Sequence, residues 1–251
     1  MIRLTPLAIA GTLAATGLTA QVGARAQQAV SSDQIHWSYR SHARGIDKPQ
    51  LRFEHGEMDT SIDAEETPDV FADLARTTAG GADLPVSFSL AREAGLLTCT
   101  GRSDEDADAA GSCRFDPNEA FIAALAARKL TPADPDEYLA LALVDAHVAL
   151  VDGLMRLGFK VDDSEKLIAL AALHVTPAYA GELRQGGLAI DDTDKLIAAR
   201  ALRIDGEWLG EMAAAGYPRL SADQAIQMRA TGVTPEYARK MARVVAATGR
   251  K

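Results

Sequence analysis

The segment Val175–Tyr179, with the sequence VTPAY, recurs as IDGEW at Ile204–Trp208 and as VTPEY at Val233–Tyr237. An apolar triplet precedes each copy at a fixed distance: KLI at 166–168, KLI at 195–197 and QAI at 224–226. Equivalent positions in successive copies are 29 residues apart, including the aromatic residue that ends each segment. A constant period is typical of a repeat array in which each unit packs against its neighbours.

Each repeat contains two sequences that are typical of a helix N-terminus. The first places an N-cap residue before a carboxylate or amide, as DDSE at 162–165, DDTD at 191–194 and SADQ at 221–224, which resembles a capping box. The second is a threonine cap followed by proline, Thr176-Pro177 or Thr234-Pro235, and Asp205-Gly206 fills this place in the middle copy.

Glycines are expected to end the second helix of each repeat, at Gly186-Gly187 and Gly216. A weaker copy runs from Tyr138 to Phe159, 29 residues before the first clear one. The sequence therefore predicts about four helical hairpins, enough to bury a shared core. The aromatic residues Tyr179, Trp208 and Tyr237 are expected to pack between repeats.

Upstream of the repeats, apolar residues alternate as in β-strands at 35–40, 51–54 and 86–90. Val86, Phe88 and Leu90 would share one face of a strand. Cys99 and Cys113 lie in two further alternating segments on either side of the polar stretch 101–112. If these segments pair as a hairpin, the two cysteines face each other within disulfide reach, and we expect a structural disulfide.

The remaining upstream elements are predicted from local signals. Residues 56–68 are acidic and expected to be irregular, and residues 69–75 are expected to form two helical turns before Gly80-Gly81. Asp116 is predicted to cap a helix with Pro117 at its first position and Phe121–Leu125 on its buried face.

The N-terminus has the pattern of an export signal. Arg3 is followed by an uncharged, largely apolar run up to Arg25, and Ala24-Arg25-Ala26 matches a cleavage site. The alternative is an uncleaved membrane anchor, since the uncharged run is long enough to span a bilayer. Two cysteines in an exported chain agree with one disulfide. We expect a periplasmic or secreted protein with no stable membrane insertion after cleavage.

Composition and motifs exclude several function classes. The net charge of -9 argues against nucleic-acid binding through phosphate neutralisation. The sequence has no HExxH zinc motif, no G-x-S-x-G elbow, no P-loop and no dinucleotide fingerprint. A calcium loop starting at Asp104 would require glycine and glutamate where Ala109 and Phe115 stand. We therefore predict no catalytic residues, no metal site and no cofactor.

Two stretches carry a resemblance to a known family: F-x-L-x-R-E-A-G at 88–95 and G-x-C-x-F-x-P-N-x-x-F at 111–121, followed by the repeats. Over roughly residues 83–248 the chain resembles an uncharacterised family of exported or membrane-tethered bacterial proteins. Similar segments form the outer portion of membrane metallopeptidases of the β-lactam-sensor (BlaR-like) type. The resemblance implies a sensing or partner-binding role. Peptidase activity does not carry over, because the chain has neither HExxH nor a membrane bundle.

These observations together predict an α+β protein, in which a small antiparallel β-module is followed by an α-helical hairpin repeat array of period 29. The predicted parts are a signal peptide at 1–26, a flexible leader at 27–34, a disulfide-closed β-module with a closing helix at 35–128 and the repeat domain at 131–251. The first hypothesis is a non-enzymatic envelope protein that binds a protein or peptide through its repeats, with Glu182, Glu211 and Arg239 as candidate contacts. The alternative is a sensor that holds a small molecule between the β-module and the first hairpins.

Overall fold

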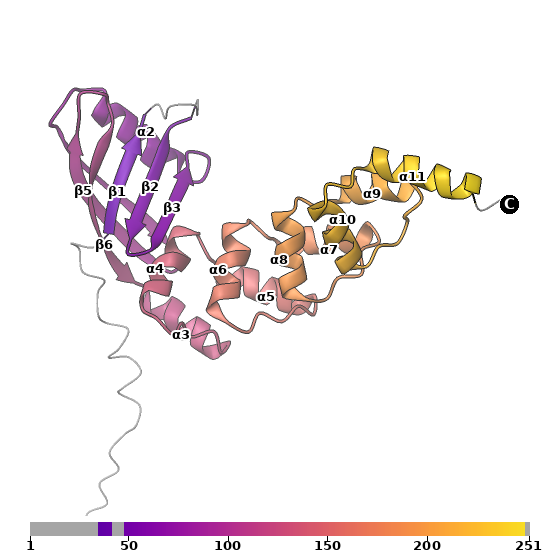
Figure 1. Cartoon of the computed structure of the whole chain (residues 1–251). Coiled ribbons are helices and arrows are strands. Elements are labelled where there is room, and N and C mark those ends of the chain that lie inside the picture. The colour runs from indigo at the N-terminus through magenta and orange to yellow at the C-terminus, as the bar shows by residue number, and fades with distance from the viewer. Residues whose placement is uncertain (1–34, 42–47, 249–251) are drawn as a thin grey trace, which may run out of the picture.

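The structure is a computed structural model that describes residues 35–41 and 48–248, with side chains up to residue 243. The expected α+β fold is confirmed, since a six-stranded antiparallel sheet is followed by an extended array of helices (Figure 1). The predicted signal peptide and leader, residues 1–34, lie outside the described residues.

Two three-stranded meanders form the sheet, and they meet in its centre through β1 and β6. The strand order is β3-β2-β1-β6-β5-β4, and every neighbouring pair is antiparallel. The strands are β1 Ile35–Arg40, β2 Gln50–His55, β3 Met58–Asp63, β4 Pro85–Arg92, β5 Gly95–Ser103 and β6 Ala109–Pro117. Helix α2, Pro68–Thr78, connects the two meanders.

One face of the sheet is apolar because its strands alternate with a period of two. Leu51, Phe53, Leu97 and Phe115 on this face are almost completely buried. Helix α2 packs against β4, and the first helix of the array's complete hairpins, α4 (Asp136–Leu143), packs against β3, β5 and β6. The array is therefore anchored directly on the core of the sheet.

The predicted disulfide is present in the β5–β6 hairpin. Cys99 and Cys113 are directly opposed in the strand register and are joined by an S–S bond, with 4.0 Å between their Cα atoms. Both side chains are buried on the apolar face. The bridge therefore joins two central strands of the sheet beneath the helices, which fits the predicted structural role.

Three local predictions are wrong. The stretch 56–68, expected to be irregular, contains the edge strand β3, and strands β5 and β6 extend so far that the loop between them shrinks to 104–108. Asp116 and Pro117 do not start a helix. They end strand β6, where Pro117 pairs with Gly95, and Asn118 caps helix α3 by accepting a hydrogen bond from the backbone N–H of Ala120 at 3.0 Å.

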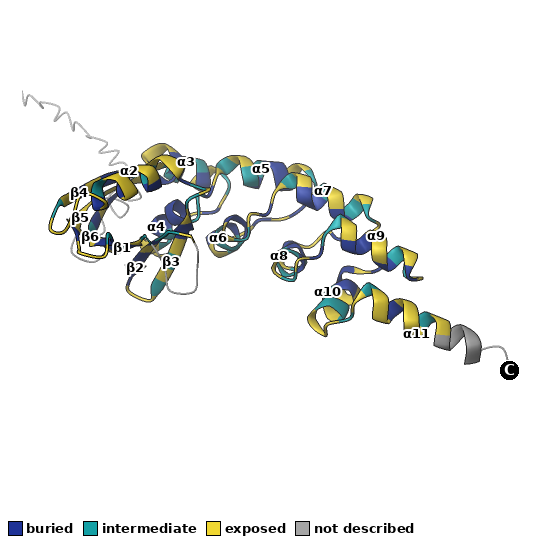
Figure 2. Ribbon diagram, turned by 90° about the horizontal axis from the view of Figure 1, so that it is seen from above, coloured by how far each residue is buried: buried dark blue, intermediate teal, exposed yellow. Residues whose placement is uncertain are grey.

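The array consists of two rows of short helices, visible in Figure 2 with buried residues between the rows. Within each row every helix contacts the next one. One row contains α4, α6 Ser164–Ala172, α8 Thr193–Ala201 and α10 Ala222–Ala230. The other contains α3 Glu119–Ala127, α5 Val148–Arg156, α7 Pro177–Gln185, α9 Gly206–Ala214 and α11 Pro235–Thr248.

The period of 29 is also present in the backbone. Left-handed residues with positive φ follow the helices of the first row at Asp145, His174, Arg203 and Gly232, which are 29 residues apart. A second series with the same spacing follows the helices of the other row, at Lys129, Gly158, Gly187 and Gly216. Because Lys129 begins this series, α3 follows the period of the array although it is covalently continuous with strand β6.

The predicted caps account for the helix starts. Asp163, Asp192 and Ser221 each accept a hydrogen bond from the backbone N–H three residues later, and Ser221 forms a full capping box with Gln224. In the other row, Thr176 and Asp205 cap α7 and α9 in the same way. These side chains satisfy backbone donors that would otherwise be unpaired at each helix start.

Candidate binding site between successive repeats

We call the space between two successive hairpins an interval. The first interval separates hairpin α4–α5 from hairpin α6–α7, the second separates α6–α7 from α8–α9, and the third separates α8–α9 from α10–α11. Tyr179 and Trp208 are buried in the second and third intervals, with 6% and 4% of their surface exposed. Their predicted packing role is confirmed.

Tyr237 was expected to pack in the same way, but 53% of its surface is exposed. In the described residues, no further repeat is present to cover its ring. The prediction of a packed ring is therefore wrong at this last position, although the threonine cap before it is present, with Thr234 Oγ1 accepting a hydrogen bond from the Tyr237 N–H at 3.1 Å.

An arginine closes both the second and the third interval. Arg200 lies over the Tyr179 ring, with its Cζ atom 5.0 Å from the ring centroid, and its Nε donates a hydrogen bond to the Leu173 carbonyl at 2.9 Å. Arg229 lies over Trp208 at 5.7 Å and donates to the Leu202 carbonyl at 3.0 Å. Each arginine thus pairs with an aromatic face and with a carbonyl at a helix C-terminus, both of which favour a cation.

The first interval lacks this arginine. The residue 29 positions before Arg200 is Ala171, the residue before Tyr179 is Leu150, and the residue before Leu173 is Val144. All three line a hollow of about 450 Å³. In the second interval, by contrast, Arg200 and Leu173 line a hollow of about 510 Å³, and Tyr179 does not, because Arg200 covers its ring.

The rim of the first hollow is polar and includes a residue from the sheet. Glu66, from the connection between β3 and α2, lies at the rim with Asp145, His147 and His174. Ala149, Val175 and Pro177 add apolar lining. The hollow therefore lies at the junction of the sheet and the array, with an apolar floor and two carboxylates at its edge.

Contacts from the tip of the β4–β5 hairpin hold this junction in place. Arg92 Nη1 lies 3.2 Å from Asp145 Oδ2, and only 9% of the Arg92 side chain is exposed. Glu93 Oε2 lies 2.9 Å from His147 Nδ1, and His147 Nε2 lies 3.4 Å from Asp145 Oδ1. The rim carboxylate of Asp145 is thus fixed from the side that faces the sheet.

The second hollow has the opposite charge. Its lining includes Arg200 and Arg203 together with His174, and Asp205 is its one carboxylate. His174 lines both hollows. Because the two hollows are formed by equivalent residues one repeat apart, the same face of the array presents an acidic rim followed by a basic one.

The candidate contact residues predicted from the sequence lie on the row of second helices. Glu182, Glu211 and Arg239 are not buried. Glu182 Oε1 accepts a hydrogen bond from the Gly206 N–H at 3.0 Å, beside Asp205 in the lining of the second hollow. The equivalent of Gly206 one repeat later is Pro235, which has no N–H, so Glu211 has no corresponding bond. The hollows themselves were not found from the sequence, although the change from arginine to Ala171 at a repeat position was a signal for them.

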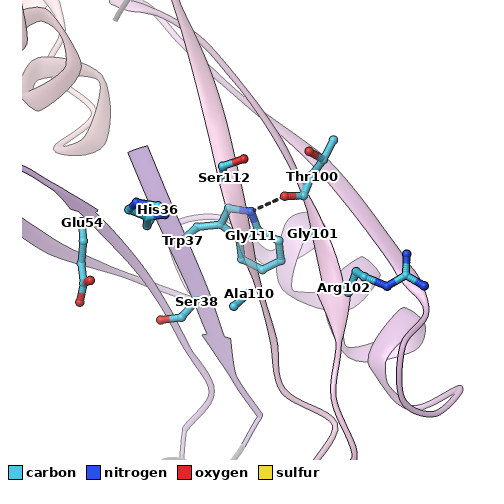
Figure 3. Close-up of a pocket in the computed structure, with 10 residues that line it drawn as sticks. All are labelled: His36, Trp37, Ser38, Glu54, Thr100, Gly101, Arg102, Ala110, Gly111 and Ser112. Atoms are coloured by element: carbon cyan, nitrogen blue, oxygen red, sulfur yellow. Dashed lines mark hydrogen bonds between the residues drawn. The ribbon is translucent and has the colours of Figure 1, made fainter. Parts of the chain in front are cut away.

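A further hollow, of about 760 Å³, lies on the sheet (Figure 3). The Trp37 indole crosses it and donates a hydrogen bond to the Thr100 carbonyl at 3.1 Å. Ser112, His36 and Glu54 are opposed in one row across β6, β1 and β2. Within the described residues no hydrogen bond joins these three side chains, so the row does not form a catalytic triad.

Other site classes are not present in the described part of the chain. No group of three or more His, Cys, Asp or Glu side chains between residues 35 and 248, apart from the undescribed 42–47, could hold a metal ion. In the same residues no single helix is long and apolar enough to cross a membrane, and α4 and α5 meet the criteria only as a pair bent by 79°.

Comparison with known proteins adds no assignment. A scan of protein-family models finds no match, and searches of curated proteins and of solved structures also find none. The case for function therefore rests on the geometry of the chain itself.

Proposed function

We propose that this chain is a non-enzymatic envelope protein that binds a protein or peptide partner along its helical repeats. The observation that carries the proposal is the recurrence of equivalent hollows in the first and second intervals of the array. Two hollows with the same backbone setting and a fixed spacing suit a partner that is itself an extended chain. Repeat arrays in general present extended surfaces of this kind.

The proposed compartment is the periplasm or the extracellular space. The disulfide between Cys99 and Cys113 favours an oxidising compartment, and the signal-like N-terminus favours export. The resemblance to the outer segments of BlaR-like peptidases supports a role in an envelope signalling or peptidase system. In this role the protein would hold or present a partner and would itself perform no chemistry.

The proposal is tested by affinity capture from the native envelope with charge-reversed variants. Glu211→Lys and Arg239→Glu are the cleanest, because both side chains are exposed and neither makes a hydrogen bond or ion pair within the described residues. We expect both to weaken capture of one recurring partner while leaving the melting temperature unchanged. Glu182→Lys is less clean, since it also removes the bond to Gly206. Unchanged capture by all three variants would contradict the proposal.

A second function is favoured by the first hollow. Its volume of about 450 Å³ and its position between the sheet and the first hairpins match the alternative of a small-molecule sensor, since ligand pockets in proteins are typically ~300–1,000 Å³. A thermal-shift screen with envelope metabolites distinguishes the two functions. A small molecule that raises the melting temperature in a concentration-dependent way by mass action, combined with no captured partner, would favour the sensor.

A further inference from the structure

We infer that the first hollow receives an arginine side chain of the partner, and that an acidic residue about three positions away in the partner enters the second hollow. This inference rests on the proposed function and specifies the partner's chemistry. The array itself contains the precedent, because Arg200 and Arg229 occupy the equivalent places in the next two intervals. The first interval has the same framework but Ala171 in place of the arginine.

The framework of the first hollow suits a guanidinium group. Val144 is the C-cap of α4, as Leu173 is the C-cap of α6, where Arg200 donates its hydrogen bond. Carbonyls at a helix C-terminus carry partial negative charge and favour cations. Ala171, one repeat before that arginine, has no donor to offer the Val144 carbonyl. A partner arginine could supply the donor, with its aliphatic stem lying against Leu150.

Charge at the rim favours a cation over a neutral ligand. The carboxylates of Glu66 and Asp145 both line the hollow. Asp145 is held by Arg92 at 3.2 Å, but a carboxylate accepts several hydrogen bonds. A guanidinium binds carboxylates in a planar, bidentate fashion that an ammonium does not reproduce. We therefore expect arginine to be preferred to lysine.

The second hollow supplies the complementary half of the motif. Arg200, Arg203 and His174 line it, and Arg203 stands where the first hollow has His174. Packed helices are about 8–10 Å apart, and an extended chain advances roughly 3.3 Å per residue. About three residues of an extended partner therefore span one interval, which places an acidic side chain of the partner against the basic lining.

The test uses short synthetic peptides and the full chain in its disulfide-bonded form. The probes are the acetylated, amidated tetrapeptides RAAE and EAAR, in both directions because the chain polarity of the partner is not fixed by the hollows. RAAK, KAAE and N-acetyl-arginine amide are the controls. Binding is followed by two-dimensional amide NMR, which also reports whether each variant is folded. We expect one of the two charge-paired peptides to bind about tenfold more tightly than RAAK or KAAE, as expected for one additional charge-assisted contact.

The decisive variant is Ala171→Arg, which places the array's own arginine in the first interval. We expect it to reduce peptide affinity by about tenfold or more without lowering the melting temperature. Ala230→Arg is the matched control, since it adds the same charge at an exposed position of α10, and it should leave binding unchanged. Glu66→Gln tests the rim independently of packing and should weaken arginine binding about threefold.

The outcomes separate this inference from the proposed function. Equal binding of wild type and Ala171→Arg, with folded spectra for both, would overturn the arginine site even if envelope capture succeeds. Arginine amide binding as tightly as the tetrapeptides would overturn the polypeptide source and favour the small-molecule sensor. Peptide binding abolished by Ala171→Arg but kept by Ala230→Arg would support the inference, even if no partner is captured from the envelope.

Discussion

Arg200 lies over the ring of Tyr179, with 5.0 Å between its Cζ atom and the ring centroid, although the two residues belong to successive repeats. The same side chain donates a hydrogen bond from Nε to the Leu173 carbonyl at 2.9 Å. Arg200 thus joins its own helix to the ring and to the helix C-terminus of the preceding hairpin. This contact stabilises the second interval, and its absence leaves the first interval open.

Replacing this arginine should destabilise the array. Arg200→Met keeps much of the aliphatic stem but removes the charge and the donor, so we expect the free energy of unfolding to fall by about 1–2 kcal/mol. Urea denaturation measures the change. Arg219→Met serves as the control, since Arg219 is exposed in the connection between α9 and α10 and should have little effect. Equal losses for the two variants would contradict a specific role for Arg200.

Stability at high pH should depend on Tyr179. Its hydroxyl donates a hydrogen bond to the Ile204 carbonyl at 2.6 Å, and burial raises the pKa of Tyr179 to about 12 from 10.0. Because the pKa is higher in the folded state, this contribution is fully present below about pH 10 and is lost as the pH rises towards 12.

The comparison of wild type with Tyr179→Phe isolates that effect. The stability difference between the two proteins should stay constant from about pH 7 to 9 and shrink by up to ~1.4 kcal/mol per pH unit above about pH 10. Chemical denaturation at a series of pH values gives the difference. A difference that does not change between about pH 9 and 11 would show that the Tyr179 phenol is not buried as described.

Two glycines on helices of the same row should respond oppositely to alanine. A Cβ atom on Gly153 would lie 2.4 Å from Pro177 Cγ at the start of the next helix, whereas a Cβ atom on Gly181 would meet nothing within 4 Å. Gly153→Ala should therefore destabilise the protein by about 1–3 kcal/mol through overpacking. Gly181→Ala should stabilise it by up to ~1 kcal/mol, since alanine favours the helix. Thermal unfolding of both variants checks the sign, and destabilisation by both would refute the assigned packing.

The disulfide should stabilise the sheet more than the array. Trp37 lies in the sheet and Trp208 in the array, and they are the two tryptophans of the chain. Each can therefore report on its own part when the other is replaced by phenylalanine. Removing the bridge between Cys99 and Cys113 by a double alanine substitution should cost about 3 kcal/mol for a loop of this length, seen first in the Trp37 signal. An effect seen only through Trp208 would contradict this assignment.

Features of the fold that depend on local chemistry were predictable from the sequence. The caps at Asp163, Asp192 and Ser221 follow from short polar side chains that reach backbone donors within one turn. The disulfide followed from alternation, because alternation places Cys99 and Cys113 on one face of adjacent strands. The period of 29 was visible because each repeat must present similar residues to its neighbours.

Features that depend on tertiary pairing were not predictable. Asp116-Pro117 has the local pattern of a helix start, but pairing of Pro117 with Gly95 continues strand β6, and proline is tolerated at a strand end. Asn118 takes over as the cap and also donates a hydrogen bond to the Glu93 carbonyl at 3.1 Å. Strand β3 is formed by pairing with β2, and its polar sequence gave no sign of it.

The candidate site was only partly accessible from the sequence. Comparing the repeats position by position shows Ala171 where arginine recurs, but its consequence depends on the ring and the carbonyl that Arg200 contacts in three dimensions. Glu66 could not have been assigned to the site, because it lies far from the repeats in the chain and reaches the rim only through the packing of the sheet on α4. The exposure of Tyr237 likewise depends on the three-dimensional setting of the last hairpin, since its sequence repeats the pattern of the buried rings.

Photo-crosslinking in the native envelope tests partner binding most directly. A photoreactive amino acid would replace Glu66, Ala172 and Glu211 in turn, which lie at the first hollow, at the second hollow and on α9. Buried Tyr179 and Ser87, on the exposed face of β4, serve as controls. We predict one recurring polypeptide adduct from the three array-facing positions and none from the controls. No adduct at any position, or equal labelling at Ser87, would contradict partner binding along the repeats.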